Sequence, residues 1–221
     1  MLEHLKPLIK QSVVRKYAAG SMILYQGEVP RSAVVIIHGI VRVYSISHQG
    51  DEQIVTYHVA GEFLPSSWIF NKTSGSLFFY EALDECEVAF VARDKLLDFM
   101  QDTEERRNAL LDYFTTSYTA SLIRISALEQ AKAREKLLYT MYYLCQRYGR
   151  RPEGKSVRIS LSLTHQSLAG LVGLTRETTA TEMNKLKKEK IITYRNQEYT
   201  VNLEKLLGLI GEESFRGVDI S

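Results

Sequence analysis

The feature of this sequence that most constrains its fold is a proline-free stretch of about fifty residues that begins near Asp102. Apolar residues recur in it at intervals of three and four, which places them on one face of an α-helix. The first part of the stretch predicts one helix of about 26 residues, roughly 39 Å long. A continuous apolar stripe of that length favours a seam between two copies of the chain, although it can also pack on a domain of its own chain. The predicted dimer seam consists of Leu111, Phe114, Tyr118, Leu122 and Ile125, and the stripe continues to Leu128.

The segment before this helix has the pattern of antiparallel β-structure. From about residue 13 to residue 91, short runs rich in Val, Ile, Tyr and Phe are separated by glycines about ten residues apart. Residues 40–46 and 53–57 are typical of two hairpin strands with a polar turn between them. These features predict a small jelly roll or β-roll, followed by a short helix through Leu96, Leu97 and Met100.

After the long helix we expect a second helix, from about residue 131 to residue 148. Gly149 and Pro152 follow it and are expected to end it. Its position before the last part of the chain predicts that it packs into a C-terminal domain. Its apolar face comprises Leu137, Leu138, Met141, Tyr142 and Cys145.

The composition excludes several classes of protein. With 45% hydrophobic and 24% charged residues, the chain is neither disordered nor fibrous in composition. The longest aliphatic run, residues 33–37, is far shorter than the roughly 20 residues of a membrane helix, and the first ten residues are too charged for a signal peptide. We therefore expect a cytoplasmic protein with no membrane partner. Two cysteines, Cys86 and Cys145, are too few to ligate an iron–sulfur cluster by themselves, and their apolar surroundings predict buried thiols.

Charge is distributed unevenly, although the formal net charge is only +2. Residues 1–129 carry 12 basic and 16 acidic side chains, whereas residues 130–221 carry 16 basic and 10 acidic ones. A basic C-terminal part suits a polyanionic partner, because neutralised phosphates release condensed counterions. A solvated basic face with no ligand is about as common, so the charge pattern favours nucleic acid only weakly.

Residues 163–186 have the pattern of two short helices joined by a turn. Thr164 and Thr175 are placed to cap these helices. The small residues Ala169 and Gly173 are expected to let the two helices approach closely. The shared core is expected to contain Leu168, Val172, Leu174, Met183 and Leu186.

The second of these helices, expected over residues 175–188, directs polar side chains outward from its first turns. Arg176 can bind guanine O6 and N7 together, Glu177 can accept a hydrogen bond from cytosine N4, and Thr181 is the third expected base contact. Lys187 and Lys190 also suit phosphate oxygens. The phosphate contacts that we expect are Thr164, Gln166, Thr175, Thr178, Lys185, Lys188 and Arg195.

A β-hairpin is expected directly after this helix. Residues 191–194 and 199–201 have strand composition, and polar residues lie between them. A helix-turn-helix followed at once by such a wing is a specific arrangement. The less specific alternative is a helical hairpin with a basic face.

At these residues the chain resembles the cyclic AMP receptor protein and fumarate–nitrate regulator (CRP/FNR) family of bacterial transcription factors. The resemblance covers almost the whole length and is most specific over residues 170–186, where residues 174–179 are close to the family's recognition-helix signature. It implies a dimer that binds a palindromic site, an effector site in the β-roll, and winged domains that the effector reorients. It also implies that Arg176 and Glu177 read bases. The family commonly has arginine where this chain has Thr181, and an apolar residue where it has Glu182.

The resulting prediction is an α+β fold with three parts. Residues 1–101 are expected to form a β-roll sensor that resembles a cyclic-nucleotide-binding domain, and residues 102–130 the dimerisation helix. Residues 131–221 are expected to form the winged helix-turn-helix domain. Double-stranded DNA and a second copy of the chain are the expected partners, and RNA polymerase is a further candidate.

The effector of the sensor is not identified by the sequence. Cyclic-nucleotide binders of the family hold ribose with a glutamate and the cyclic phosphate with an Arg-Ser or Arg-Thr pair, since an anion needs a charged fork. Residues 61–64 resemble the start of that cassette, but Pro65, Ser66 and Ser67 follow them. Residues 76–78, Ser-Leu-Phe, stand where the arginine is expected. Cyclic AMP in its usual pose is therefore not expected. The candidate effector pocket consists of Phe63, Ser66, Trp68, Ser76, Leu77, Phe78 and Tyr118, although such aromatic clusters are more often core.

The histidines are the candidate metal ligands of the predicted β-roll. His38, His48 and His58 are spaced ten residues apart, but this is the hairpin repeat, and His48 lies in an expected turn. We therefore expect no metal site. Haem held by His58 or Cys86 stays open, because single residues can supply axial ligands.

The leading hypothesis is a homodimeric DNA-binding regulator with an unidentified effector. An effector-independent architectural DNA-binding protein is the first alternative, because the arginine at position 181 and the phosphate cassette are missing. A metal-dependent jelly-roll enzyme is the second, but the β-roll has no convergent set of histidines and carboxylates at suitable spacing. We therefore do not expect an enzyme.

Overall fold

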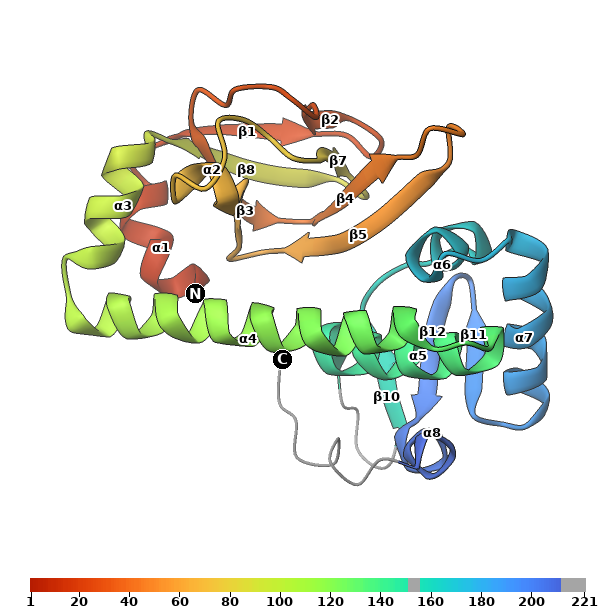
Figure 1. The fold of residues 1–221 in the computed structure, drawn as a ribbon. Coiled ribbons are helices and arrows are strands. Elements are labelled where there is room, and N and C mark those ends of the chain that lie inside the picture. The colour runs from red at the N-terminus through yellow and green to blue at the C-terminus, as the bar shows by residue number, and fades with distance from the viewer. Residues whose placement is uncertain (151–155, 212–221) are drawn as a thin grey trace. The chain divides into compact units, whose positions relative to one another are not determined.

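The computed structural model describes residues 1–150 and 156–211. The chain divides into two compact units, Met1–Tyr113 and Phe114–Ser221. The long helix α4 (Glu104–Glu129) begins in the first unit and ends in the second (Figure 1). Within the described ranges, no helix is both long enough and apolar enough to cross a membrane.

The first unit contains two four-stranded antiparallel sheets, which confirms the predicted β-roll. One sheet has the strand order β1-β8-β3-β6 and the other β2-β7-β4-β5. The predicted hairpin is β4 and β5, whose register pairs Ile40 with Val59 and Ile46 with Glu52. The strands are β1 (Val13–Tyr17), β2 (Met22–Leu24), β3 (Ala33–His38), β4 (Ile40–Ile46), β5 (Glu52–Val59), β6 (Phe63–Leu64), β7 (Phe79–Ala82) and β8 (Cys86–Val91).

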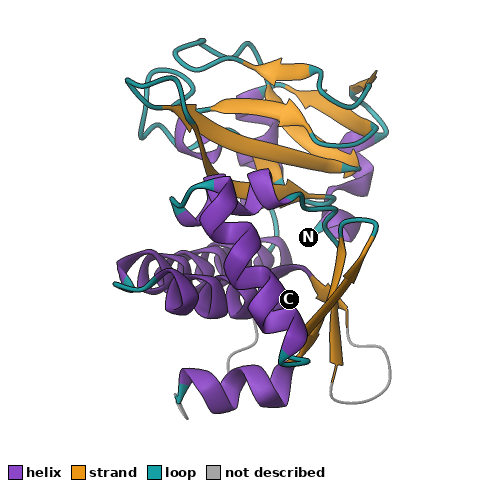
Figure 2. Cartoon of the chain, turned by 90° about the vertical axis from the view of Figure 1, so that its right-hand side faces the viewer, coloured by secondary structure: helices purple, strands orange, loops and turns teal. Residues whose placement is uncertain are grey.

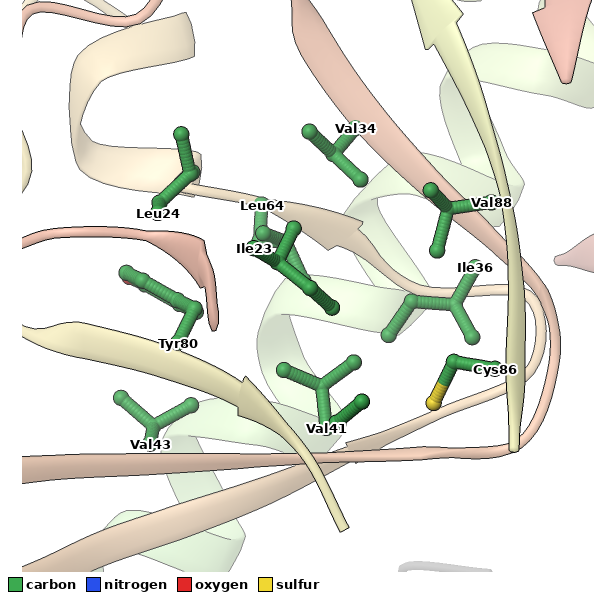
Figure 3. Close-up of a cluster of buried hydrophobic side chains, with 11 residues drawn as sticks. Ile23, Leu24, Val34, Ile36, Val41, Val43, Leu64, Tyr80, Cys86 and Val88 are labelled. Atoms are coloured by element: carbon green, nitrogen blue, oxygen red, sulfur yellow. The ribbon is translucent and has the colours of Figure 1, made fainter. Parts of the chain in front are cut away.

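Alternate residues of these strands form the core of the β-roll. Val41 and Val43 on β4 are buried at 0% and 2% exposure, and they lie in one cluster with residues of β3, β7 and β8 (Figure 3). Arg42 between them points to the other face of the sheet, because side chains alternate along a strand. Gly39 makes the turn into β4 at φ +90°, and a Cβ there would lie 2.5 Å from the Glu85 carbonyl oxygen. The turn therefore needs glycine.

Four helices accompany the strands of the first unit: α1 (Leu2–Ile9), α2 (Ser66–Ile69), α3 (Arg93–Gln101) and the start of α4. The sequence predicted α3 but not α1. Helix α1 has eight residues with Pro7 among them, so its helical signal is weak, but Leu5 and Leu8 bury one face of it. Tertiary packing rather than propensity stabilises so short a helix.

Helix α4 has the predicted length of 26 residues and begins two residues later than expected. Four members of the predicted seam are exposed: Leu111 at 67%, Tyr118 at 65%, Leu122 at 48% and Ile125 at 51%. Phe114 is half-buried. An exposed apolar stripe along a helix is typical of a surface that another chain covers.

The second unit has the predicted winged-helix order of elements. After the end of α4 it contains α5 (Ala133–Tyr148), β9 (Gly149–Arg150), β10 (Ser156–Ile159), α6 (His165–Val172), α7 (Arg176–Lys188), β11 (Ile192–Arg195), β12 (Glu198–Asn202) and α8 (Leu203–Ile210). Its strands form one antiparallel sheet of order β11-β12-β10-β9. Helix α5 ends at Gly149 as expected, where a Cβ would lie 2.0 Å from the Cys145 carbonyl oxygen. Pro152, the second expected end signal, lies outside the described residues.

Candidate nucleic-acid interface

Two threonines define where the helices of the helix-turn-helix begin. The Thr164 hydroxyl oxygen accepts a hydrogen bond from the Ser167 amide at 3.0 Å, and that of Thr175 accepts one from the Thr178 amide at 3.1 Å. Each bond satisfies an amide that has no partner within its own helix. The predicted caps are confirmed. Figure 2 draws the helices of this unit in purple and its strands in orange.

The turn between the two helices corrects one expectation. Gly173 was expected to allow close approach of α6 and α7, but a Cβ at this position would meet nothing within 4 Å. Its backbone has φ +67° and ends α6 in the left-handed conformation, with its amide bonded to the Ala169 carbonyl. Glycine is needed here for its conformation and not for its size. Ala169 itself is buried at 2% exposure.

The shared core holds α6 and α7 together largely as predicted. Leu168, Val172, Met183 and Leu186 are each fully buried, whereas Leu174 is half-buried in the turn. With the apolar side chains inward, the opposite face of α7 is free to carry polar groups. Arg176, Glu177, Thr181, Lys185, Lys187 and Lys188 are all exposed.

Glu182, where the family commonly has an apolar residue, lies at the edge of this polar face. Its side chain is only 14% exposed and pairs with Lys185 at 2.6 Å. The ion pair explains how the helix accommodates a carboxylate here. It also means that Lys185 already has an anionic neighbour, which lowers its availability for phosphate.

The predicted wing is the hairpin of β11 and β12. A two-residue turn joins the strands, and Asn196 and Gln197 in it have φ values of 51° and 66°. Positive φ at both positions is typical of the tight turn that matches the twist of hairpin strands. Lys187 of α7 stands 4.5 Å from the centre of the Tyr194 ring, and Tyr194 stacks on Tyr199 at 5.3 Å. These contacts join the wing to the recognition helix.

A cleft of about 510 Å³ lies where the starts of α6 and α7 meet the wing. We call it the wing cleft. Thr164, His165 and Gln166 of α6, Arg176 of α7 and Tyr194 of the wing are among its lining residues. It therefore joins one expected base reader, Arg176, to two expected phosphate contacts, Thr164 and Gln166.

His165 is the residue of this cleft that the sequence reasoning missed. Its ring packs edge-on against Tyr194 at 5.6 Å, and its Nε2 is buried with no hydrogen-bond partner among the described residues. The pKa of His165 is lowered, first by desolvation and then by the positive charge of Arg176. A histidine directly after a helix-capping threonine was a visible signal, but its environment depends on wing residues about thirty positions later.

Two arginines attach the helix-turn-helix to the helices before it. Arg124 of α4 is 7% exposed, and its guanidinium donates a hydrogen bond to the Leu171 carbonyl in the last turn of α6. Such terminal carbonyls have no partner within the helix and favour a cation. Arg134 of α5 forms a bidentate pair with Glu189 at 2.9 and 2.6 Å, directly after α7. This hydrogen bonding lowers the pKa of Glu189 and raises that of Arg134.

Comparison with known proteins identifies this arrangement. Residues 14–103 match the family model of the cyclic nucleotide-binding domain, and residues 135–209 match that of the Crp-like helix-turn-helix domain. The nitrogen fixation regulation protein FixK of Rhizobium meliloti is 28% identical over 206 residues, which cover 92% of this chain and 90% of FixK. The chain belongs to the CRP/FNR family. It is a DNA-binding transcription regulator and not an enzyme.

Other relatives and solved structures agree with this assignment. The fumarate and nitrate reduction regulatory protein of Vibrio cholerae is 26% identical over 213 residues, covering 96% of this chain and 80% of the relative. A CooA mutant from Carboxydothermus hydrogenoformans superposes with a TM-score of 0.77 at 18% identity, covering 95% and 94% of the two chains. FixK2 from Bradyrhizobium japonicum has a TM-score of 0.72 at 18% identity, covering 90% and 96%. The CRP/FNR fold predicted from the sequence is confirmed.

The residues of the candidate effector pocket of this CRP/FNR regulator differ in burial. Phe63 is fully buried and packs on Phe70 at 6.0 Å, whereas Leu77 is 48% exposed. The hydroxyl of buried Ser76 donates to the Phe78 carbonyl at 2.7 Å. Ser66, Trp68 and Phe78 are half-buried, and Tyr118 lies exposed on α4.

These positions do not fit an anionic cyclic nucleotide in the usual pose. None of the candidate pocket residues carries a charge, and a cyclic phosphate needs a charged fork. Trp68 lies under the guanidinium of Arg93 at 5.2 Å, but that arginine also donates to the Ile69 carbonyl at 2.9 Å. The guanidinium thus already has a local structural role.

The histidines and cysteines of the β-roll were the other candidate ligands. His38 pairs in register with Glu87 on β8, His48 lies in the exposed turn after β4, and Nδ1 of His58 contacts the Glu62 carboxylate. Across residues 1–150 and 156–211, no three His, Cys, Asp or Glu side chains are grouped to hold a metal ion. Both cysteine thiols are buried, as predicted.

Cys86 fits poorly as a haem ligand. Desolvation, with the nearby Asp84 carboxylate, raises the pKa of its thiol to about 11. The thiol also donates a hydrogen bond to the Ile40 carbonyl at 3.2 Å. Because the thiolate is the form that binds a metal, this environment disfavours ligation.

Proposed function

We propose that this chain regulates transcription as a homodimer that reads a palindromic DNA site with two copies of α7. The observation that carries the proposal is the position of Arg176, Glu177 and Thr181, exposed on the first two turns of a capped helix whose other face is core. The first turns of a recognition helix are those that reach base edges in the major groove. Arg176 binds guanine, Glu177 accepts from cytosine, and Thr181 makes the third contact.

The phosphate contacts that we propose surround this helix. Thr164 and Gln166 lie at the start of α6, Thr175 and Thr178 at the start of α7, and Lys185 and Lys188 at its end. Arg195 lies exposed at the wing turn. Phosphate contacts of this kind fix the position of a protein on the duplex without reading its sequence.

The dimer is proposed to form through the exposed stripe of α4. Burying large apolar side chains removes their surface from water, at about 1.5–3 kcal/mol for each one fully buried. Leu111, Tyr118, Leu122 and Ile125 offer such surface on one helix, and Phe114 lies among them. Residues 102–130 are accordingly assigned to dimerisation, residues 1–101 to sensing and residues 131–221 to DNA binding.

The sensing unit is proposed to bind an effector other than cyclic AMP in its usual pose, because Ser66, Ser76 and Leu77 lack the charges that a cyclic phosphate requires. A regulator of this kind acts in the cytoplasm, and RNA polymerase is the further partner that we propose for it. The alternative of an effector-independent architectural protein rests on the same missing charges and on Thr181.

Selection from a random duplex library tests the proposal. The purified full-length chain is used at about physiological salt, where binding through phosphates alone is weak. We expect enrichment of a two-fold palindrome with half-sites about one helical turn apart and a G·C pair at a fixed place in each. Strong binding without any enriched palindrome would favour the architectural alternative.

A further inference from the structure

The wing cleft has a chemical character that the expected DNA contacts do not explain. Arg176 is the charged residue among those that line it, and no acidic side chain is among the described lining residues. The other groups are neutral: Thr164 and Gln166 from α6, and aromatic and amide side chains from the wing. The cleft therefore favours an anion over a cation.

His165 is one of the residues that line this cleft. Its Nε2 is buried and has no hydrogen-bond partner in the described part of the chain. A buried polar atom without a partner costs free energy and calls for an explanation. The same side chain lines the wing cleft, so a turn of the ring would present Nε2 to a ligand that enters the cleft.

The surroundings of His165 disfavour its charged form. Tyr194 of β11 packs against the ring, Tyr199 of β12 stacks behind Tyr194, and Lys187 of α7 stands over Tyr194. Burial raises the pKa of the Tyr199 hydroxyl, so this residue carries no charge either. The positive charge of Arg176 disfavours a second positive charge on His165, and Lys187 adds another positive charge over the Tyr194 ring.

We propose that a phosphate of the DNA backbone enters the wing cleft and that His165 takes up a proton from solvent to donate a hydrogen bond to it through Nε2. The inference rests on the proposed function, since it adds a proton-linked phosphate contact to the same DNA interface. Each cleft that DNA fills takes up one proton from solvent, and the proton returns to solvent when the DNA dissociates. Arg176 remains free to reach base edges at the mouth of the cleft.

The linkage has a definite sign. In the free protein the pKa of His165 lies below the usual value for histidine, because of desolvation and of Arg176. A bound phosphate carries the opposite charge and raises that pKa in the complex. Between the two pKa values the complex holds more protons than the free protein, so DNA affinity rises as the pH falls through this window. Above the window the contact is lost and the affinity no longer changes.

The test measures duplex affinity against pH at constant ionic strength for three full-length proteins. These are the wild type, His165→Gln, and His48→Gln as a control at an exposed turn histidine of the β-roll. A fluorescent duplex of random sequence serves as the probe, because a phosphate contact is independent of sequence. We expect the wild type and His48→Gln to bind about tenfold more tightly at the low end of a pH range of about 5.5–8.5, and His165→Gln to show no such gain. Tenfold corresponds to about one unit of pKa difference in all, or about half a unit for each of the two clefts of a dimer.

A second measurement does not depend on a variant. The pKa of His165 in the wild type is followed by NMR of its ring nitrogens, without and with the same duplex. We expect a rise in pKa on binding. Equal pH profiles for the wild type and His165→Gln, or an unchanged pKa on binding, would overturn the inference while leaving the proposed function intact. Failure of the wild type to bind any duplex at every pH would overturn both.

Discussion

Replacement of Arg176 by alanine removes the base contact on which the proposed function most depends. The side chain is exposed and forms no salt bridge with another described residue, so its loss is expected to leave the folded protein's stability within about 0.5 kcal/mol. In the complex, a bidentate contact with guanine contributes about 1–3 kcal/mol of discrimination. For each half-site this is about a 5-fold to 150-fold loss of affinity, since 1.4 kcal/mol corresponds to tenfold.

The assay is fluorescence anisotropy with the selected palindrome, the same palindrome with the fixed G·C pair replaced, and a random duplex. The anisotropy is measured at about pH 8, above the range in which histidine usually titrates. At this pH a change in the charge of His165 does not contribute to the measured affinities. We expect Arg176→Ala to bind the first two duplexes equally. The matched control is Lys188→Ala, which should weaken all three duplexes alike and lower the salt dependence by about one unit. An equal proportional loss on all three for Arg176→Ala would refute its role as a base reader.

Three further predictions concern the architecture. Leu122→Glu places a charge on the exposed stripe of α4 and should convert the dimer to a monomer in sedimentation at micromolar concentration. An unchanged sedimentation coefficient would mean that the stripe does not form the dimer interface. Thr175→Ala, which removes the hydrogen bond to the Thr178 amide, should lower the free energy of unfolding by about 1 kcal/mol in urea denaturation; no change would mean that water replaces the cap. Arg124→Ala leaves the buried Leu171 carbonyl without its donor and should cost about 1–3 kcal/mol in the same assay, whereas a neutral result would show that the contact does not stabilise α6.

The elements that the sequence predicted share a strong local signal. Helix α4 follows from its apolar repeat, and α6 and α7 follow from Thr164 and Thr175 before apolar runs. The missed helix α8 has such a signal as well. The Asn202 side chain accepts a hydrogen bond from the Lys205 amide at the start of α8, and Gly211 ends the helix. A capping asparagine and a terminal glycine are both sequence signals of a helix, so α8 could have been predicted.

The features that could not be predicted are set by contacts between distant residues. Gly173 is the exception, because its role follows from the local backbone conformation that ends α6 and not from the packing distance of two helices. In the sequence, Arg124 looks like an ordinary surface charge on a long helix. The structure shows that it instead donates a hydrogen bond to the Leu171 carbonyl. His165 is a similar case, because its burial comes from Tyr194 in the wing. Sequence spacing describes one element at a time and carries no information on such pairs.

The measurement that tests the central claim most directly is the effect of half-site spacing on affinity. A dimer joined by α4 presents its two recognition helices to one face of the duplex, so inserting about five base pairs, half a helical turn, moves one half-site to the opposite face. We expect the insertion to reduce the affinity for the selected palindrome nearly to that for a single half-site, and an insertion of about ten base pairs to be less harmful. Equal affinity for the original and five-base-pair variants would contradict the account, because the two half-sites would then be read independently.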